Sequence, residues 1–278
     1  MTNTPSTAPT GGELSGPMGR PIRFTHDIPG WQRIIQALGG TVISAHPGWL
    51  VYQLGSGRVA LHAASEAQPP GMTFAIETPQ PLAEAVEHAA SRGVPITLED
   101  SDHGPAGVFT AADAISGWLD SPTPVEVGND QTDATQTNAT QPPAGAATDP
   151  RLSCVQIWYG PDTAIPRGVA EGLGAQARLV SDNGTWTDLT LPGGGLIGIH
   201  AAETVGTELA FEWDGDVEDA LALLEQARVE AMLIDETYSR TVQITDPDGL
   251  KAIWINERQT DLYGYRDASV DSADSSVS

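Results

Sequence analysis

The feature that most constrains this chain of 278 residues is an internal duplication. The segment 57–64 (GRVALHAA) corresponds to 195–202 (GLIGIHAA), and the segment 71–77 (GMTFAIE) corresponds to 206–212 (GTELAFE). A helical pattern follows in both places. Similar segments that recur in the same order indicate two copies of one structural unit. We therefore predict two similar domains in a single chain.

Three polar segments flank and separate the two copies. Residues 1–19, 121–150 and 266–278 are rich in polar residues, Pro and Gly and contain few apolar residues. Such segments cannot bury enough apolar surface to offset the entropy that is lost on ordering. We expect a disordered N-terminus, a disordered linker and a disordered acidic tail. The predicted domains are then 20–120 and 151–265.

Hydrophobic periodicity indicates the elements within each domain. Apolar residues at i, i+3, i+4 and i+7 predict a helix at 31–38, and similar patterns cover 81–92 and 216–228. Alternation of apolar residues over 59–64 is typical of a strand. The predicted succession is a strand, a helix and two or three strands, and it occurs twice in each domain. The fold class is therefore α+β, with four half-units.

Three features of this succession are more specific. A strand that ends in Asp leads into a helix that stops at Leu-Gly, at 24–39 and again at 158–174. A midpoint strand and helix follow at 209–221, and an Asp-Pro-Asp-Gly turn at 246–249 precedes a closing strand at 252–255. Together these features resemble the vicinal oxygen chelate superfamily, the fold of glyoxalases and bleomycin-resistance proteins. The resemblance implies two glyoxalase-like domains, in each of which two βαβββ units form a curved sheet around a cleft.

The resemblance also implies where a metal would be held. Enzymatic members bind a divalent metal through His, Gln or Glu side chains from several strands of the sheet. In the second domain these positions fall at Val155 or Gln156, near Glu208, and at Ile253. The first domain has Arg or Pro and then Thr at the matching positions, and it lacks the Asp-Pro-x-Gly turn. Because weak donors and an alkyl side chain do not hold a catalytic ion, we predict no bound metal and no other cofactor.

A ligand-binding cleft is the preferred prediction for the site. The duplicated histidines are expected one in each cleft, where an imidazole can form hydrogen bonds or transfer protons. Tryptophans on predicted strands can stack on flat ligands or bind cations through their π faces. A simpler alternative is that the histidines are structural and that the tryptophans pack in the core. No catalytic residue is assigned. The predicted lining residues are Gln156, Trp158, His200, Glu208 and Trp254, with His62 in the first domain.

Three functions are compatible with these features. The preferred one is a small-molecule-binding protein without a catalytic metal, because the bleomycin-resistance branch of the superfamily acts by sequestration alone. The alternative is a metal-dependent lyase, isomerase or dioxygenase, for which Gln156, Glu208 and His200 would form the metal shell. A third is a structural module whose clefts are filled by side chains.

Composition narrows the partners and the location. The chain has 13 Lys and Arg against 37 Asp and Glu, a net charge of −24, so its field repels nucleic acids and anionic membranes. The sequence contains no secretion signal and no apolar run of membrane-spanning length, which favours the cytoplasm. A single cysteine, Cys154, excludes intramolecular disulfides. We expect a small organic ligand as the partner, and a monomer or a homodimer. An aromatic segment at 261–265 is expected to fold back onto an edge of a sheet or cleft.

Overall fold

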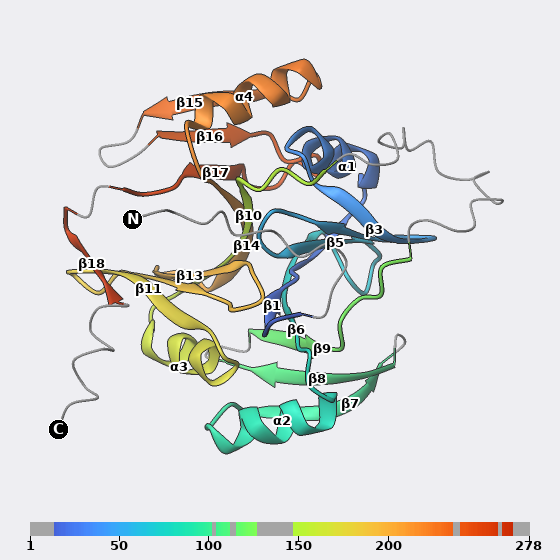
Figure 1. The fold of residues 1–278 in the computed structure, drawn as a ribbon, viewed down its shortest axis with the longest axis vertical. Coiled ribbons are helices and arrows are strands. Elements are labelled where there is room, and N and C mark those ends of the chain that lie inside the picture. Colours follow the sequence, from blue (N-terminus) through green and yellow to red (C-terminus); the bar gives the residue numbers. More distant parts are fainter. Residues whose placement is uncertain are drawn as a thin grey trace, which may run out of the picture.

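The computed structural model describes residues 14–101, 104–111, 115–126, 147–235, 240–260 and 263–268. Within these residues the chain forms two mixed nine-stranded sheets and four helices. The prediction of an α+β protein with two similar domains is confirmed. The sheets meet at the centre of the molecule, and the helices lie toward its periphery (Figure 1).

The first domain follows the predicted succession of elements. Its strand order is β3-β4-β5-β2-β6-β9-β8-β7, with β1 paired to β6 outside this order. The pairs β2–β5 and β6–β9 are parallel, as two similar half-units require. The elements are β1 (Met18–Gly19), β2 (Ile22–Thr25), α1 (Ile28–Ala37), β3 (Thr41–His46), β4 (Trp49–Gln53), β5 (Arg58–Ala63), β6 (Gly71–Glu77), α2 (Leu82–Ser91), β7 (Ile96–Ser101), β8 (Gly104–Thr110) and β9 (Ser116–Asp120).

The second domain repeats the same topology. Its order is β15-β16-β17-β14-β10-β13-β12-β11-β18; read from β11 to β15, this matches the eight-strand order of the first domain, while β18 and the first domain's β1 have no counterparts. β18 pairs antiparallel with β11, so Tyr265, the last residue of the expected aromatic segment, lies on a sheet edge, whereas Tyr263 is exposed and residues 261–262 lie outside the described residues. The elements are β10 (Leu152–Gly160), α3 (Ala164–Gly172), β11 (Gln176–Ser181), β12 (Trp186–Thr190), β13 (Leu196–Ala201), β14 (Gly206–Trp213), α4 (Val217–Gln226), β15 (Ala231–Asp235), β16 (Arg240–Ile244), β17 (Ile253–Glu257) and β18 (Tyr265–Asp267).

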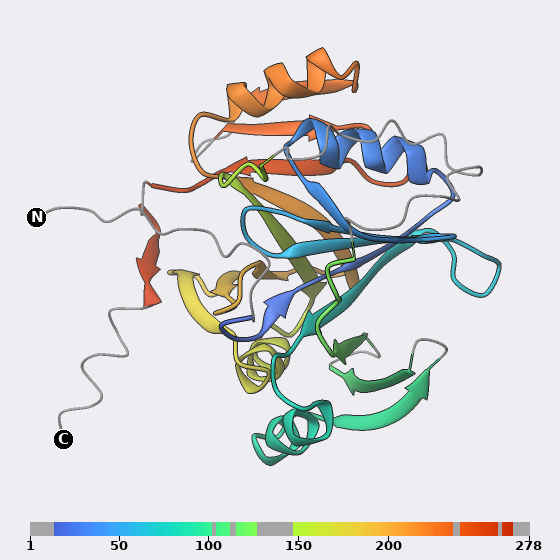
Figure 2. The same ribbon diagram turned by 45° about the vertical axis from the view of Figure 1, so that its right-hand side comes forward.

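The helices cover the sheets with their apolar faces. α1 begins at Asp27, whose carboxylate accepts a hydrogen bond from the backbone N–H of Gly30 and so satisfies one free donor of the first turn. Its buried face carries Trp31, Ile34 and Ile35. α1 of the first domain contacts α4 of the second, and the two lie side by side in both views (Figures 1 and 2). One hydrophobic core cluster therefore includes residues of both domains.

The predicted N-terminal disorder does not extend to the described residues before position 20. Met18 and Gly19 form β1, and the backbone N–H of Gly19 donates to Gly194 O at 2.9 Å. Gly193 N donates in turn to Pro17 O at 2.8 Å. A Cβ atom on Gly193 would lie 2.3 Å from Gly16 O, so the close backbone approach depends on glycine. The prediction of disorder from the polar composition did not anticipate this contact, because backbone groups form its hydrogen bonds.

The predicted linker also begins with packed residues. The backbone N–H of Thr123 donates to the buried carboxylate of Glu77, and the N–H of Glu126 donates to Ile43 O. Residues 127–146 and 1–13 lie outside the described residues, as does most of the predicted tail. β18 crosses the predicted domain end at 265, because its backbone completes the edge of β11.

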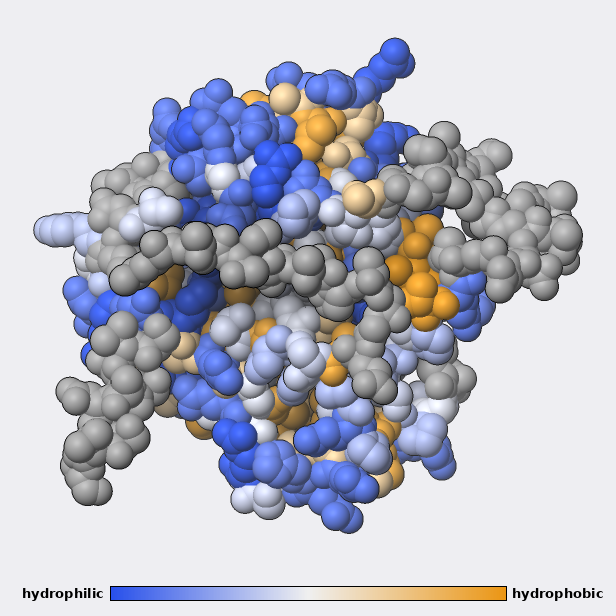
Figure 3. All heavy atoms as spheres, viewed as in Figure 1, coloured by the Kyte–Doolittle hydropathy of each residue, from blue (hydrophilic) through white to orange (hydrophobic). Residues whose placement is uncertain are grey.

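The face drawn in Figure 3 is mostly hydrophilic among the described residues, with smaller hydrophobic patches. This agrees with the excess of acidic residues in the sequence. None of the described helices combines the length and the apolar character needed to span a membrane.

Candidate ligand-binding cleft

The second domain has a cleft of about 290 Å³ on one face of its sheet. Strand β10 contributes Val155, Ile157 and Tyr159 to the lining, every second residue, as the alternation of side chains in a strand requires. Val155 and Ile157 form an apolar cluster with Leu196 of β13 and Ala210 of β14. The floor of the cleft is therefore made of alkyl side chains.

Aromatic rings surround His200 at one side of this floor. His200 on β13 lies opposite Trp186 on β12 and opposite Tyr159 on β10. Its ring centroid is 5.7 Å from Trp186 at an interplanar angle of 68°, and 5.5 Å from Tyr159 at 49°. Its Nδ1 atom is buried and has no hydrogen-bond partner among the described residues. Trp254 of β17 and Tyr265 of β18 complete the aromatic lining.

An ionic cluster forms the polar wall of the cleft. Arg178 of β11 donates to Asp188 Oδ2 through Nε at 3.0 Å and to Glu212 Oε1 through Nη1 at 2.9 Å. Burial raises the pKa of Asp188 to about 6, although the adjacent Arg178 lowers it. Burial also opposes the charge on Arg178, but its bonds to Glu212 and Asp188 raise its pKa overall. Asp188 Oδ1 is buried without a hydrogen-bond partner in the described structure.

Glu208 lies at the edge of the cleft. It is paired with Lys251, whose Nζ is 2.5 Å from Glu208 Oε1, and the same Nζ lies 5.5 Å from the ring centroid of Tyr159. Burial raises the pKa of Tyr159, and the charge and hydrogen bond of Glu208 raise it further. Glu208 therefore contacts a lining residue and lines the adjacent pocket, which also contains Arg23.

Two of the predicted lining residues do not face the cleft. Gln156 is fully buried on the opposite face of β10 and hydrogen-bonds the backbone of Ala75 in the first domain. Trp158 is also buried, with its ring centroid 5.1 Å from that of Phe74. The prediction for both is wrong because β10 is apolar on both faces, so its sequence does not show which face is inward. His200 and Trp254 do line the cleft.

The first domain has an equivalent cleft of about 550 Å³. His62 lies there opposite Trp49 and opposite Phe24, with ring centroids 5.6 Å and 5.1 Å away. Trp118 of β9 takes the place that Trp254 has in the second domain. Each domain therefore repeats one arrangement, in which a strand histidine lies between a tryptophan and a second aromatic ring.

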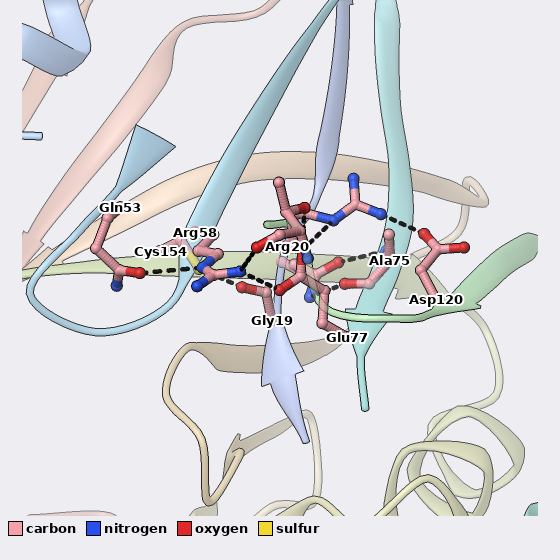
Figure 4. A network of polar contacts seen from close by, with 10 residues as sticks. Gly19, Arg20, Gln53, Arg58, Ala75, Glu77, Asp120 and Cys154 are labelled. Atoms are coloured by element: carbon pink, nitrogen blue, oxygen red, sulfur yellow. Dashed lines mark hydrogen bonds and ion pairs between the residues drawn. The ribbon is translucent and has the colours of Figure 1, made fainter. Parts of the chain in front are cut away.

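A buried ionic network includes Arg20 and Asp120, two residues that line the first-domain cleft (Figure 4). Glu77 is fully buried, with Oε1 2.9 Å from Arg20 Nε and Oε2 2.6 Å from Arg58 Nη1. Arg20 also pairs with Asp120. Thr123 of the following segment donates through both its N–H and its hydroxyl to Glu77 Oε1. The segment 121–124 thereby contributes to the lining of this cleft.

The sequence reasoning missed the most polar residues of the second cleft, Arg178 and Asp188. They lie on neighbouring strands, and nothing in the sequence pairs them. Trp186 was recognisable, because it precedes His200 by almost the same interval that separates Trp49 from His62. An alignment of the two copies on His62 and His200 places Trp186 next to the position of Trp49.

Several solved structures share this fold. The 2,3-dioxygenase LapB from Pseudomonas sp. KL28 matches with a TM-score of 0.55 and 15% identity, over 90% of this chain and 94% of that one. Homoprotocatechuate 2,3-dioxygenase from Arthrobacter globiformis matches with a TM-score of 0.55 and 14% identity, over 91% and 82%. The Mn(II)-bound glyoxalase from Novosphingobium aromaticivorans matches with a TM-score of 0.54 and 10% identity, over 92% and 85%. No protein-family model and no curated protein matches the sequence.

These neighbours establish the fold of the chain. The chain has the two-domain fold of the vicinal oxygen chelate superfamily, as the resemblance in its sequence predicted. At these identities the similarity establishes the fold, and the activity has to be argued from the residues of the cleft.

The described residues do not offer the set of donor atoms that a divalent metal such as the Mn(II) of the glyoxalase would need. The floor residues Val155, Ile157, Leu196 and Ala210 offer no donor atom, although His200 of β13 and Glu212 of β14 also line the cleft. No group of three or more His, Cys, Asp or Glu side chains that could hold a metal ion occurs within the described parts of the chain. The alternative shell of Gln156, Glu208 and His200 is not assembled, because Gln156 points to the opposite face.

Proposed function

We propose that the cleft of the second domain binds a small organic molecule without the help of a catalytic metal. The observation that carries this proposal is the pair of unpartnered polar atoms, Asp188 Oδ1 and His200 Nδ1, which belong to two residues lining one aromatic cleft. Buried polar atoms are normally hydrogen-bonded, and a ligand or an ordered water can supply the missing partner. An open pocket with aromatic walls and a few polar groups is typical of small-molecule sites.

The repeated arrangement of histidine and aromatic rings supports a binding role for the framework. In the first domain, however, the segment 121–124 lines the cleft. Arg20 and Arg58 are engaged there in ion pairs with Glu77 of the same domain. The first cleft also has an unpartnered buried atom, Nη1 of Arg20, but that side chain is already paired with Glu77 and Asp120. In the second cleft two different residues have unpartnered buried atoms, Asp188 Oδ1 and His200 Nδ1, within the described structure. For this reason we assign ligand binding to the second domain first.

The competing function is that of a metal-dependent dioxygenase, glyoxalase, lyase or isomerase, as the structural neighbours are dioxygenases and a glyoxalase. The test is the metal content of protein purified without chelator or histidine tag, measured by inductively coupled plasma mass spectrometry. We expect metal at background. Close to one equivalent of Fe, Mn, Zn, Ni or Co per chain would overturn the metal-free proposal.

Binding itself is tested by ligand-observed NMR with a diverse fragment library. We expect fragments that bind the wild-type chain and lose binding in His200→Ala and Trp254→Leu. The matched control is His88→Ala, because His88 is exposed on α2 and is not among the residues that line the second cleft. The absence of any fragment whose binding depends on the cleft residues would end the proposal. The expectations of a monomer or homodimer and of a cytoplasmic location stay predictions, and light scattering after size exclusion decides the first.

A further inference from the structure

The second cleft has an excess of negative charge. Among the described residues that line it, Arg178 faces three carboxylates, those of Asp188, Glu212 and Glu257. Arg178 is bonded to the first two. Glu257 is 3.1 Å from Arg240, which lies outside the lining and also pairs with two other carboxylates. The cleft is therefore acidic, and an anionic ligand would be repelled.

One of these carboxylates is buried and only half satisfied. The side chain of Asp188 is 8% exposed, and its Oδ2 atom is bound by Arg178. Its Oδ1 atom has no hydrogen-bond partner in the described part of the chain. His200 Nδ1, on the neighbouring strand, is unpartnered as well. A positively charged N–H donor is the partner that a buried carboxylate oxygen binds most strongly.

The aromatic walls of the cleft also suit a positively charged ligand. Tyr159, Trp186, Trp254 and Tyr265 all contribute to the lining. Aromatic faces attract organic cations through the ring quadrupole, with indole the strongest of them. Tyr159 already has the ammonium group of Lys251 5.5 Å from its ring centroid at the edge of the cleft.

The first domain contains an internal example of this recognition. The guanidinium of Arg20 lies 5.4 Å from the ring centroid of Trp49 and pairs with Asp120. Trp49 corresponds to Trp186, because each lies opposite the histidine of its own cleft. In the first cleft, therefore, a cation of the chain itself, Arg20, contacts the ring of Trp49.

The second domain has no cation at the corresponding tryptophan within the described residues. Val155 is the counterpart of Arg20, because each precedes by four residues the aromatic residue that lies opposite the cleft histidine. An alkyl side chain cannot supply the charge, and the cation that lines the second cleft, Arg178, is bonded to Asp188 and Glu212. The ring of Trp186 therefore has no cation of the chain over it among the described residues.

We propose that the second cleft binds a small organic cation that carries a flat hydrophobic group, with its ammonium at Asp188 and its ring between Trp186 and Trp254. This inference rests on the proposed function and narrows it to one class of ligand. The unpartnered Asp188 oxygen supplies the charge complement, and the apolar floor of Val155 and Ile157 accommodates the ring.

The test uses three probes of one shape and different charge: 1-naphthaleneethanamine, which is an ammonium ion at neutral pH, 1-naphthaleneethanol and 1-naphthaleneacetate. Isothermal titration calorimetry on the full chain is expected to give an affinity for the ammonium about tenfold higher than for the alcohol, since one charge-assisted hydrogen bond accounts for such a factor. No heat of binding is expected with the acetate.

Two variants and a control assign the effect. Asp188→Asn should lower the affinity for the ammonium by about tenfold and leave that for the alcohol unchanged. Trp254→Leu should weaken the binding of both. Glu225→Gln removes the same charge from an exposed position on α4 and should change neither, which excludes a general effect of the acidic chain.

The outcomes separate this inference from the proposed function. Equal affinity for the ammonium and the alcohol, or no effect of Asp188→Asn on the ammonium, overturns the assignment of a cation while small-molecule binding stands. Failure of all three probes to bind at millimolar concentration also overturns it. If the fragment screen then gives no cleft-dependent binder either, both proposals fail.

Discussion

Gln156 of the second domain forms two hydrogen bonds with the backbone of Ala75 in the first. Its Oε1 atom accepts from Ala75 N at 3.0 Å, and its Nε2 atom donates to Ala75 O at 3.1 Å. Both residues are fully buried. A residue that we expected in a ligand cleft therefore joins the two domains.

Replacing Gln156 by Leu should destabilise the whole chain. The change removes the side-chain partner of the buried N–H of Ala75, whereas the Ala75 carbonyl keeps the backbone N–H of Arg20 as a donor. One buried N–H without a partner costs about 1–3 kcal/mol, so we expect the free energy of unfolding in urea to fall by about that amount. Gln226→Leu, at an exposed position on α4, is the control. A loss as small as that of the control would show that the two bonds contribute little to domain association.

Arg23 is the second contact that joins the domains. Its Nη2 atom lies 2.9 Å from Asp246 and 2.8 Å from Asp248, in the Asp-Pro-Asp-Gly turn of the other domain, and all three side chains are buried. Removing one partner of a buried ion pair leaves an uncompensated charge. We therefore expect Arg23→Gln to lower the free energy of unfolding by about 3–5 kcal/mol.

A matched control for this change is Arg167→Gln. Arg167 pairs with Glu171 on the surface of α3, where an ion pair contributes less than about 1 kcal/mol. Unfolding of the two variants in parallel by urea compares a buried pair with an exposed one. Equal losses for Arg23→Gln and Arg167→Gln would contradict a structural role for the turn between the domains.

Cys154 should be unreactive in the folded protein. Its side chain is fully buried, and burial raises the pKa of its thiol to about 12, so the thiolate is scarce at neutral pH. We expect no reaction with Ellman's reagent under native conditions and one equivalent of thiol per chain after denaturation in guanidinium chloride. Rapid labelling of the native chain would show that the region around β10 opens readily.

The sequence was sufficient for the fold because duplication and hydrophobic period are local signals. The segments 57–64 and 195–202 became β5 and β13 in equivalent positions of two sheets of the same strand order. His62 and His200 reached equivalent clefts for the same reason. Their place depends on strand alternation and on the repeat, and both are visible in one sequence.

The orientation of β10 could not be predicted in this way. Its residues are apolar on both faces, since one face forms the cleft floor and the other packs against the first domain. Alternation identifies the inward face only where the other face is polar. The choice between Val155 and Gln156 is therefore made by the packing of the domains. The pairing of Arg178 with Glu212, residues 34 apart, likewise depends on the tertiary fold.

The stability of the chain should report the unusual environment of Asp188. Burial raises the pKa of this carboxyl to about 6 in the folded state from an ordinary value of 3.8, so the folded state binds its proton more tightly than the unfolded state does. The stabilising contribution is complete below the unfolded pKa and is lost as the pH rises through about 6. At neutral pH Asp188 is ionised, and the burial of its carboxylate lowers the free energy of unfolding.

Asp188→Asn removes this titration and should gain stability relative to the wild type as the pH rises. We expect the difference in the free energy of unfolding, variant minus wild type, to increase by on the order of 1–3 kcal/mol between about pH 4 and pH 7. Other carboxyl groups titrate in both proteins and cancel in the difference. Glu225→Gln, which removes an exposed carboxylate from α4, should show a difference that does not change with pH. A constant or falling difference for Asp188→Asn would mean that the ion pair with Arg178 outweighs the burial of the carboxyl, and that Asp188 keeps an ordinary acidity in the cleft.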